Sequence, residues 1–289
     1  MTNEIWTIGR ILKWTAGYFQ EKGIESPRLD AEVLLAHILK KERIYLYVHF
    51  DEPLEPSELA QYREAIKKRV RRVPVAYITG QRDFMGLTFH VTPDVLVPQP
   101  DTEILVQEAK ERLEKVEGPV KFADIGTGSG AICLSLLAEL PKAVASTVDI
   151  SPAARAVAEE NARELGVADR IAFYTGDLLA PLEGEQFDAI LSNPPYIPDG
   201  DIPGLAPEVK SQEPMLALAG GRDGLDFYRR LAKDAPDLIK NGGFLAVEVG
   251  IHQADSVAKL FAAHPRVKTT SIVKDYAGID RVVIADIDA

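Results

Sequence analysis

The sequence VKFADIGTGSGAICLSLLAEL, residues 120–140, carries the strongest structural pattern of this 289-residue chain. Its first six residues predict a buried strand, GTGSG at 126–130 predicts a tight turn, and the apolar run that follows predicts a helix. Glycines allow positive φ angles and a close approach to a ligand, while a helix start presents N–H groups. The order strand, glycine-rich turn, helix is typical of a nucleotide-type binding loop, although the turn alone would also suit an ordinary strand-to-helix connection.

A second strand is expected at residues 143–149, and its last residue, Asp149, is well placed to accept hydrogen bonds from ribose hydroxyls. Three features favour S-adenosylmethionine over a dinucleotide. The glycine pattern is G-x-G-x-G, Asp124 could face the ammonium group of the cofactor, and Asp177 follows the third strand, near the expected adenine. The residues predicted to bind S-adenosylmethionine are Gly126, Thr127, Gly128, Ser129, Gly130, Asp149, Asp177, Leu178 and Asn193.

Strand and helix patterns alternate through the rest of the chain, after a helix at residues 101–117. This alternation predicts an α/β fold with a doubly wound, mostly parallel, seven-stranded sheet. The last two strands have no room for a helix between them, so the final strand is expected to be antiparallel. The predicted strands are residues 120–125, 143–149, 170–175, 187–192, 243–249, 267–274 and 281–287.

The first part of the chain has helical periodicity instead. Helices are expected at 5–22, 28–40, 43–49 and 58–72, with Ser57 as the cap of the last. Strands at 89–91 and 95–97 around a Pro-Asp turn predict a hairpin. The expected domains are therefore a helical substrate-docking domain (1–74), a hairpin linker (75–100) and an S-adenosylmethionine-binding methyltransferase domain (101–289).

The tetrad Asn193-Pro194-Pro195-Tyr196 follows the apolar strand predicted at 187–192. An amide NH2 is a poor nucleophile because its lone pair is delocalised. The Asn193 side-chain oxygen and the Pro194 carbonyl can each accept one N–H of such a group, and the two prolines hold these acceptors in place. Tyr196 could stack on the planar group. The tetrad therefore predicts methylation of an amide-type nitrogen, with a strand-ending turn as the alternative.

The chain resembles the release-factor glutamine N5-methyltransferases, a family of S-adenosylmethionine-dependent class I methyltransferases. The resemblance runs nearly from end to end, whereas the Asn-Pro-Pro-Tyr tetrad alone is also similar to that of adenine-N6 methyltransferases. The matching segments are 26–35 (SPRLDAEVLL), 77–80 (YITG), 84–86 (FMG), 98–103 (PQPDTE), 124–130 (DIGTGSG), 193–197 (NPPYI), 213–214 (EP), 224–228 (GLDFY) and 275–281 (DYAGIDR).

The resemblance implies direct methyl transfer from S-adenosylmethionine to the glutamine of the Gly-Gly-Gln motif in peptide-chain release factors. Asn193 and Pro194 would be catalytic, Pro195 and Tyr196 would also contact the substrate, and the helical domain would help to dock the release factor. The chain departs from the family at Gln99, where arginine is usual. Glutamine has neither the charge nor the forked donors of arginine, so Asp101 and Glu103 are expected to need other partners.

Composition limits the remaining possibilities. A net charge of −11 disfavours binding to nucleic acid, although residues 67–72 (KKRVRR) form a short basic run. Cys133 is the single cysteine, so no internal disulfide forms, and it is expected to pack as a small apolar residue. The histidines lack ligand spacing and no metal site is expected. We expect a cytoplasmic protein, because no segment has the pattern of a leader or a membrane span. We also expect it to be a monomer.

Two other functions fit part of the pattern. An adenine-N6 methyltransferase of DNA or RNA would use the same tetrad, and the acidic balance of charge argues against it. A non-catalytic S-adenosylmethionine-binding subunit would not need the intact Asn193 and proline pair. Residues 197–224 show no obvious regular structure and are expected to close over the substrate, with a plain surface loop as the alternative.

Overall fold

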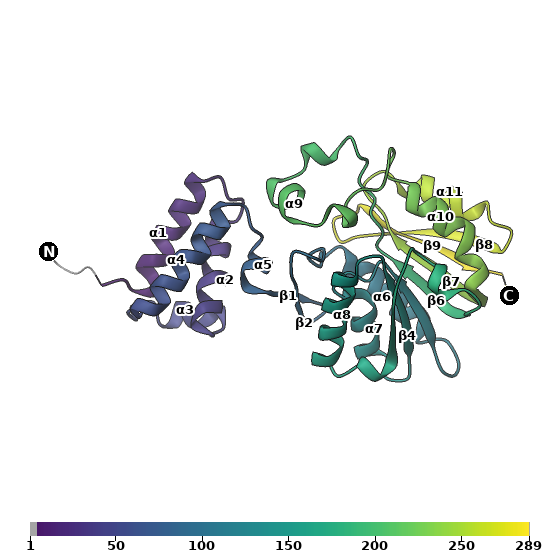
Figure 1. Ribbon diagram of the computed structural model, residues 1–289, viewed down its shortest axis with the longest axis horizontal. Coiled ribbons are helices and arrows are strands. Elements are labelled where there is room, and N and C mark those ends of the chain that lie inside the picture. Colours follow the sequence, from purple (N-terminus) through teal and green to yellow (C-terminus); the bar gives the residue numbers. More distant parts are fainter. Residues whose placement is uncertain (1–4, 289) are drawn as a thin grey trace. The chain divides into compact units, whose positions relative to one another are not determined.

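The structure is a computed structural model that describes residues 5–288. The chain forms two compact units (Figure 1). The first ends at Gly80 and also contains Pro207–Gln212, and the second contains Gln81–Ala206 and the residues from Glu213 onward.

The first unit is helical. Its core is built from the apolar faces of the helices around the fully buried side chains of Phe19, Leu35 and Tyr62. The Tyr62 hydroxyl donates to the Ala31 carbonyl at 2.9 Å, which satisfies the one polar group of this buried ring. The helices are α1 (Ile8–Glu21), α2 (Pro27–Leu39), α3 (Arg43–Val48), α4 (Pro56–Val70), α5 (Val75–Thr79) and α9 (Pro207–Gln212).

The four helices expected in this unit are found, but the prediction that Ser57 caps the last one is wrong. Helix α4 begins at Pro56, and Glu55 is its N-cap. Glu58 accepts from the Glu55 backbone N–H at 2.8 Å in a capping box. Proline suits the first helical position because its fixed φ is already helical and its missing N–H is not needed there.

The second unit begins with a hairpin of β1 (Gln81–Phe84) and β2 (Leu87–His90). The expected hairpin at 89–91 and 95–97 is therefore wrong in its register and its turn. Met85 and Gly86 form the turn, with φ angles of +50° and +73°. Two successive positive φ angles match the right-handed twist of the flanking strands, which the Pro-Asp pair at 93–94 could not do.

A seven-stranded sheet forms the centre of the second unit, as predicted. Its strand order is β5-β4-β3-β6-β7-β9-β8, and β9 is antiparallel to both β7 and β8. The other neighbours are parallel, so the carboxyl ends of β3, β4, β6 and β7 lie at one edge. The strands are β3 (Lys121–Ile125), β4 (Val144–Asp149), β5 (Ile171–Thr175), β6 (Phe187–Ser192), β7 (Ile239–Glu248), β8 (Val267–Lys274) and β9 (Asp280–Ile287).

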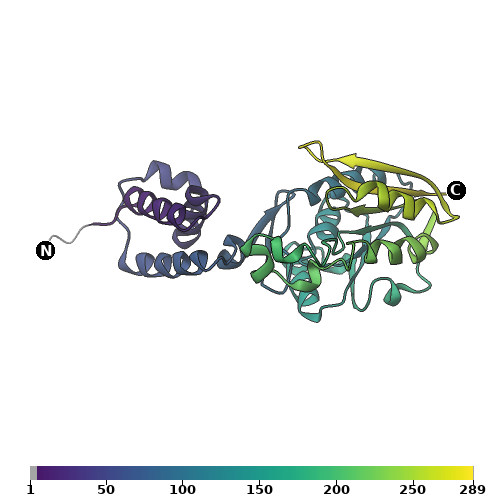
Figure 2. The ribbon, with the colours of Figure 1, turned by 90° about the horizontal axis from the view of Figure 1, so that it is seen from above.

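Alternate residues of each strand face two separate apolar cores. In β6, Ala189 and Leu191 pack with α6 (Thr102–Leu113) and α7 (Ala131–Glu139), whereas Ile190 packs on the opposite side. This period of two requires helices on both faces of the sheet. Figures 1 and 2 show α10 and α11 across the sheet from α6, α7 and α8. The bounds of the helices not given above are α8 (Pro152–Glu164), α10 (Asp226–Asp234) and α11 (Ala254–Ala262).

The segment 197–224 was expected to lack regular structure, and this expectation is wrong in part. It contains two short 3-10 helices, Ile202–Gly204 and Met215–Ala217, as well as α9. Ile197 and Ala219 form an isolated parallel bridge, with the Ile197 N–H donating to the Leu218 carbonyl at 3.0 Å. The segment therefore leaves the sheet after the tetrad and returns beside its own start.

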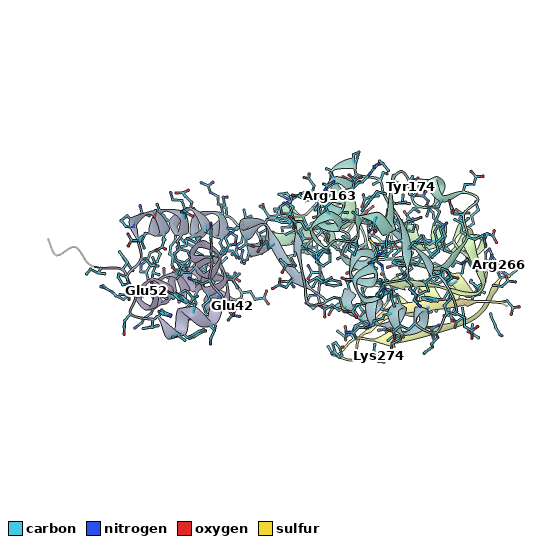
Figure 3. All side chains as sticks on the ribbon, turned by 90° about the horizontal axis from the view of Figure 1, so that it is seen from below. Glu42, Glu52, Arg163, Tyr174, Arg266 and Lys274 are labelled. Carbon is cyan, nitrogen blue, oxygen red and sulfur yellow. The ribbon has the colours of Figure 1, made fainter. Side chains whose placement is uncertain are left out.

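The surface is rich in charged side chains, including Glu42 and Glu52 on the helical unit and Arg163, Arg266 and Lys274 on the second unit (Figure 3). Cys133 is fully buried within an apolar core, which confirms the expectation for its packing. Within residues 5–288, no helix is long and apolar enough to cross a membrane. The same residues contain no group of three or more His, Cys, Asp or Glu side chains arranged to hold a metal ion.

Buried Asn161 of α8 links the hairpin to the glycine-rich loop. Its amide nitrogen donates to the carbonyls of His90 (3.0 Å) and Ser129 (2.8 Å), and its oxygen accepts from the His90 N–H (2.7 Å). The side chain therefore ties three elements of the second unit together through backbone groups that would otherwise lack partners.

Replacing Asn161 by alanine should lower the free energy of unfolding by about 1–3 kcal/mol, because buried backbone groups lose their hydrogen bonds. Urea denaturation measures this change. Glu164→Ala, an exposed position on the same helix, is the matched control and should change stability by less than about 0.5 kcal/mol. Equal effects of the two substitutions would contradict this role for Asn161.

Candidate active site

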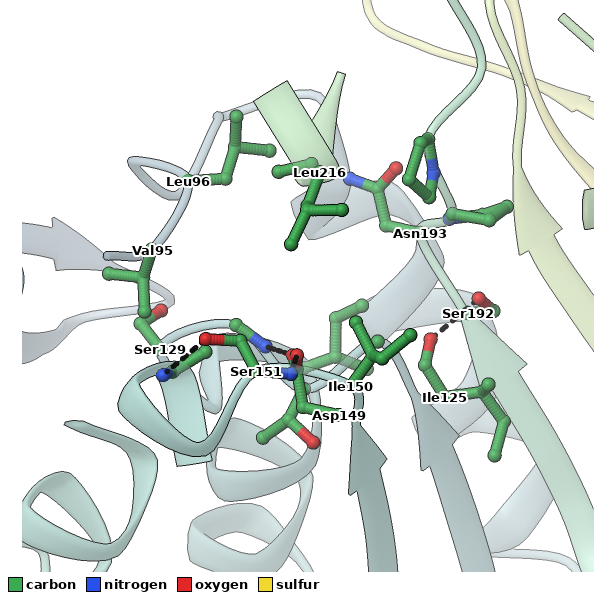
Figure 4. A pocket seen from close by; sticks show the side chains of 18 of the residues that line it. Val95, Leu96, Ile125, Ser129, Asp149, Ile150, Ser151, Ser192, Asn193 and Leu216 are labelled. Atoms are coloured by element: carbon green, nitrogen blue, oxygen red, sulfur yellow. Dashed lines mark hydrogen bonds between the residues drawn. The ribbon is translucent and has the colours of Figure 1, made fainter. Parts of the chain in front are cut away.

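A cavity of about 220 Å³ opens at the carboxyl ends of β3, β4 and β6, entirely within the second unit (Figure 4). The glycine-rich loop and Asp149 lie on one side of it, and Asn193 lies on the opposite side. Of the residues predicted to bind cofactor or substrate, those that line it are Gly126, Thr127, Gly128, Ser129, Asp149, Asp177, Leu178, Asn193, Pro194 and Pro195.

The glycine-rich loop is held by hydrogen bonds of its own backbone. The N–H groups of Gly126 and Thr127 both donate to the Val148 carbonyl, at 2.9 and 3.2 Å. Gly130 has a φ of +83° at the start of α7, where a β-carbon would meet Leu134 Cδ1 at 2.7 Å. Gly130 therefore allows the tight turn into α7. It does not belong to the cavity lining formed by the described residues.

Asp149 fixes the loop as well as facing the cavity. Its two carboxylate oxygens accept from the backbone N–H groups of Gly128 (2.9 Å) and Ser151 (2.8 Å). Burial raises the pKa of this carboxyl, and the two N–H donors partly oppose that rise. Each oxygen retains a second lone pair, so the side chain can still accept a hydroxyl donor from a ligand.

Asp177 and Leu178 line the cavity just beyond β5. Asp177 is largely exposed and accepts from Arg230 of α10 at 2.7 Å, and this hydrogen bond lowers the pKa of its carboxyl. Leu178 has a φ of +50°, an uncommon conformation for a non-glycine residue. The pair therefore presents one acidic and one apolar side chain at this edge.

Asp124, expected to face the cofactor ammonium group, lies beneath the loop instead. Its side chain is 1% exposed, and neither carboxyl oxygen makes a hydrogen bond within residues 5–288. Burial raises its pKa to about 7, while the nearby Cys133 thiol and N–H partly offset this rise without reaching hydrogen-bond geometry. Asp124 is also not one of the cavity-lining residues among those described.

The tetrad divides between the cavity and the protein interior. Asn193, Pro194 and Pro195 line the cavity, but Tyr196 is not part of the described lining. The Tyr196 ring packs against the core of the second unit, and its hydroxyl faces Glu248 at 3.4 Å. Burial raises the pKa of Tyr196 well above its usual value. The side chain of Tyr196 therefore anchors the tetrad to the core of the second unit and does not face the cavity.

Two polar residues beside the tetrad were not identified from the sequence. The Thr102 hydroxyl, at the start of α6, donates to Glu248 Oε2 at 2.5 Å and accepts from the Asn193 amide nitrogen at 3.1 Å. Glu248 is the last residue of β7 and is 1% exposed. A carboxylate that directly follows the apolar run at residues 244–247 was the available signal, and the pairing of distant strands was needed to interpret it.

The segments before α6 and after the tetrad also contribute apolar lining that the sequence did not predict. Val95 and Leu96 come from the irregular stretch after the hairpin, and Leu216 comes from residues 197–224 (Figure 4). Their positions follow no periodicity, so only the folded chain brings them to the cavity. Residues 197–224 therefore contribute to the cavity lining, and their closure over the substrate stays a prediction.

Gln99 lines the cavity and donates to the Val97 carbonyl at 2.8 Å. The acidic residues that follow it have other partners, as expected. Asp101 pairs with Arg281 at 3.1 Å, and Glu103 accepts from the Met85 N–H at 2.9 Å. The turn before α6 is therefore ordered without an arginine at position 99.

The sheet order and the cavity at its carboxyl edge define a class I methyltransferase fold. The crystal structure of a methyltransferase from Pyrococcus furiosus matches 81% of this chain and 100% of its own, with a TM-score of 0.53 and 16% identity, and so supports the fold alone. Residues 99–205 match the family model described as methyltransferase small domain, and residues 10–80 match PrmC N-terminal domain.

The relatives identify the family. A release factor glutamine methyltransferase of Geobacter sulfurreducens is 46% identical over 97% of this chain and 96% of its own length. Another, of Moorella thermoacetica, is 47% identical over 91% and 92%. The chain belongs to the release factor glutamine methyltransferase family.

Membership of this family and the fold imply the use of S-adenosylmethionine, and the cavity suits such a molecule. The lining combines apolar side chains such as Val148 and Leu178 with the acceptor Asp149 and the polar backbone of the loop. A nucleoside with hydroxyl donors and an apolar base needs this combination of surfaces. The donors and acceptors present therefore fit the implied cofactor.

Replacing Gln99 by arginine should change the free energy of unfolding by less than about 1 kcal/mol, because Asp101 and Glu103 already have partners and an added pair near the surface is weak. Urea denaturation in low salt measures this change. A larger gain in stability would mean that the turn before α6 is incompletely ordered in the natural chain.

Proposed function

We propose that this protein transfers the methyl group of S-adenosylmethionine to the side-chain amide nitrogen of the glutamine in the Gly-Gly-Gln motif of peptide-chain release factors. The observation that carries the proposal is the presence of Asn193 and Pro194 in the same cavity as the glycine-rich loop and Asp149. The residues predicted to bind the cofactor and those predicted to accept from the amide therefore line one cavity, and two relatives carry the corresponding name.

When bound, S-adenosylmethionine supplies an electrophilic methyl group on a sulfonium. The loop residues Gly126 to Ser129, together with Asp149, would hold it, with Asp149 accepting from the ribose. Asp177 and Leu178 would lie beside the adenine. Because these groups come from a rigid sheet edge, they fix the position of the cofactor relative to Asn193.

Asn193 and Pro194 would act on the substrate amide. The Asn193 side-chain oxygen and the Pro194 carbonyl each accept one N–H, which aims the nitrogen lone pair and stabilises the positive charge that develops on it. The two prolines keep these acceptors in place before the substrate arrives. A substrate glutamate would bring only acceptors to them, so the same pair of groups would select glutamine over glutamate.

The helical domain, residues 1–74, would dock the release factor, while the linker, 75–100, and residues 101–289 would carry the cavity and its entrance. The helical unit exposes several large apolar side chains, among them Trp14 and Tyr47, each about half exposed. Such side chains are typical of protein-binding surfaces. The protein would act as a monomer without direct contact to nucleic acid, in keeping with its net charge of −11.

Transfer of labelled methyl from S-adenosylmethionine to a purified release factor tests the proposal. Label should appear on the release factor, and should be lost when its Gly-Gly-Gln motif is changed to Gly-Gly-Glu. DNA serves as the control substrate. Label on DNA alone would favour an adenine-N6 methyltransferase, and no label on any substrate would favour a non-catalytic subunit; either result would overturn the proposal.

Two substitutions separate the amide acceptors from the cofactor site. Asn193→Ala should lower kcat by about 10² or more, with a smaller effect on cofactor affinity, because one acceptor is lost. Asp149→Ala should instead weaken S-adenosylmethionine binding first, since a hydroxyl acceptor and the partner of the Gly128 N–H both disappear. Steady-state kinetics and calorimetric titration measure the two effects. The reverse pattern would contradict both assignments.

A further inference from the structure

The Asn193 carboxamide can face the cavity in two ways, and only one is useful. With its oxygen toward the substrate it accepts an N–H, whereas with its nitrogen there it would oppose the substrate NH2. The oxygen and nitrogen have nearly the same size, so shape cannot select between the two orientations. The selection has to come from the hydrogen-bond partners of the side chain.

Thr102 provides such a partner. Its hydroxyl has one proton, and Glu248 Oε2 lies 2.5 Å away while the Asn193 nitrogen lies 3.1 Å away. An ionised carboxylate can only accept, so the hydroxyl proton must point to Glu248. The hydroxyl oxygen can then only accept from Asn193, which requires the amide nitrogen on that side. Within the described residues no protein group donates to the Asn193 oxygen, so it stays available.

Glu248 is held in the matching orientation. Its Oε1 faces the Tyr196 hydroxyl at 3.4 Å, and its backbone carbonyl accepts from the Tyr228 hydroxyl of α10 at 2.7 Å. Both side chains of the pair are buried, with Thr102 5% and Glu248 1% exposed. Water therefore cannot easily replace either partner. The hydrogen bonds from Asn193 to Thr102 and from Thr102 to Glu248 consequently keep one donor-to-acceptor direction.

We propose that Thr102 and Glu248 are positioning residues that orient the Asn193 carboxamide, so that its oxygen faces the substrate amide. This inference rests on the proposed function, because it assigns the oxygen its use. In the ionised state the Asn193 nitrogen donates to the Thr102 hydroxyl, and this hydroxyl donates to Glu248. The direction of both hydrogen bonds reverses if Glu248 gains a proton. A protonated Glu248 can donate to Thr102, which frees the hydroxyl proton for the Asn193 oxygen.

The surroundings of Glu248 place this reversal near neutral pH. Burial raises the pKa of Glu248 to about 7, while Thr102, Arg281 and Tyr196 favour the charged form and Asp101 opposes it. The Tyr228 hydroxyl lies close to the same residue and donates to the Glu248 backbone carbonyl. Because the folded pKa lies above the usual glutamate value, the active orientation is favoured above about 7 and is lost as the pH falls.

Thr102→Val tests the inference, since it keeps the shape and removes the hydroxyl. In the release-factor assay its kcat should fall about tenfold or more, with little change in cofactor affinity, and Thr102→Ser should restore most of the activity. Thr269→Val is the matched control, because Thr269 donates to Asp286 at 3.0 Å in an exposed pair away from the cavity, and it should keep the wild-type kcat. A wild-type kcat for Thr102→Val would overturn the inference.

A double-mutant cycle separates positioning from a merely structural role. If Thr102 acts through Asn193, Thr102→Val should have little further effect on kcat in an Asn193→Ala background. Independent, multiplicative losses would overturn the inference. Thermal unfolding of each variant checks that the comparison is made between folded proteins.

Glu248→Gln provides the pH test. The kcat of the natural protein should fall as the pH decreases through about 7, whereas that of the variant should be low and lack this step, because glutamine cannot ionise. A step of the same size and position in Glu248→Gln would assign it to another group and overturn the role of Glu248.

An NMR measurement keeps this inference separate from the proposed function. The side-chain NH2 resonances of Asn193, assigned by their absence in Asn193→Ala, should shift in Thr102→Val because a hydrogen bond is lost. Unchanged resonances would overturn the inference. If the wild-type protein transferred no methyl group to a release factor, the proposed function would fail while this readout would still decide the orientation of Asn193.

Discussion

Parallel pairing of the central strands is the constraint on which the site depends. β3 pairs with β4 on one side and with β6 on the other, in register over most of its length. Parallel neighbours place their carboxyl ends at a common edge, so the residues that follow these strands meet without any further contact between them. Gly126, Asp149 and Asn193 are brought together in this way from distant parts of the sequence.

The two apolar cores make this arrangement rigid. Alternate residues of β3, β6 and β9 pack on helices at opposite faces, so neither face of the sheet can shift without exposing apolar surface. Two polar side chains of this unit hold the glycine-rich loop in place through hydrogen bonds to its backbone. Asn161 holds the glycine-rich loop to the hairpin, and Asp149 holds the same loop from the cavity side.

The tetrad illustrates how such burial can determine chemistry as well as stability. Its prolines and Asn193 reach the cavity, whereas Tyr196 turns inward to Glu248. The same carboxylate meets Thr102, which in turn contacts Asn193. A network that satisfies a buried charge therefore also determines which atom of the amide side chain is free, because each hydroxyl has only one proton to donate.

Much of the architecture and part of the site followed from the sequence. The seven strands, their alternation with helices and the antiparallel last strand were predicted because apolar periodicity and connection length are local properties. Two errors also came from local patterns. Ser57 was predicted as a helix cap because serine is common at that position, but Glu55 is the N-cap. The hairpin was predicted around the Pro-Asp pair, but Met85 and Gly86 form its turn.

The residues at strand ends, from the glycine-rich loop to Asn193, could be named from the sequence because parallel sheets gather such ends at one edge. The contacts of Thr102 with Glu248, of Asp101 with Arg281, and the inward turn of Tyr196 could not. They join α6, β7 and β9, which are far apart in the chain and adjacent only across the folded sheet. The sequence alone thus determined the fold and the chemical type of the site, and the tertiary structure decided which buried partners orient it, because those partners are set by packing between distant strands.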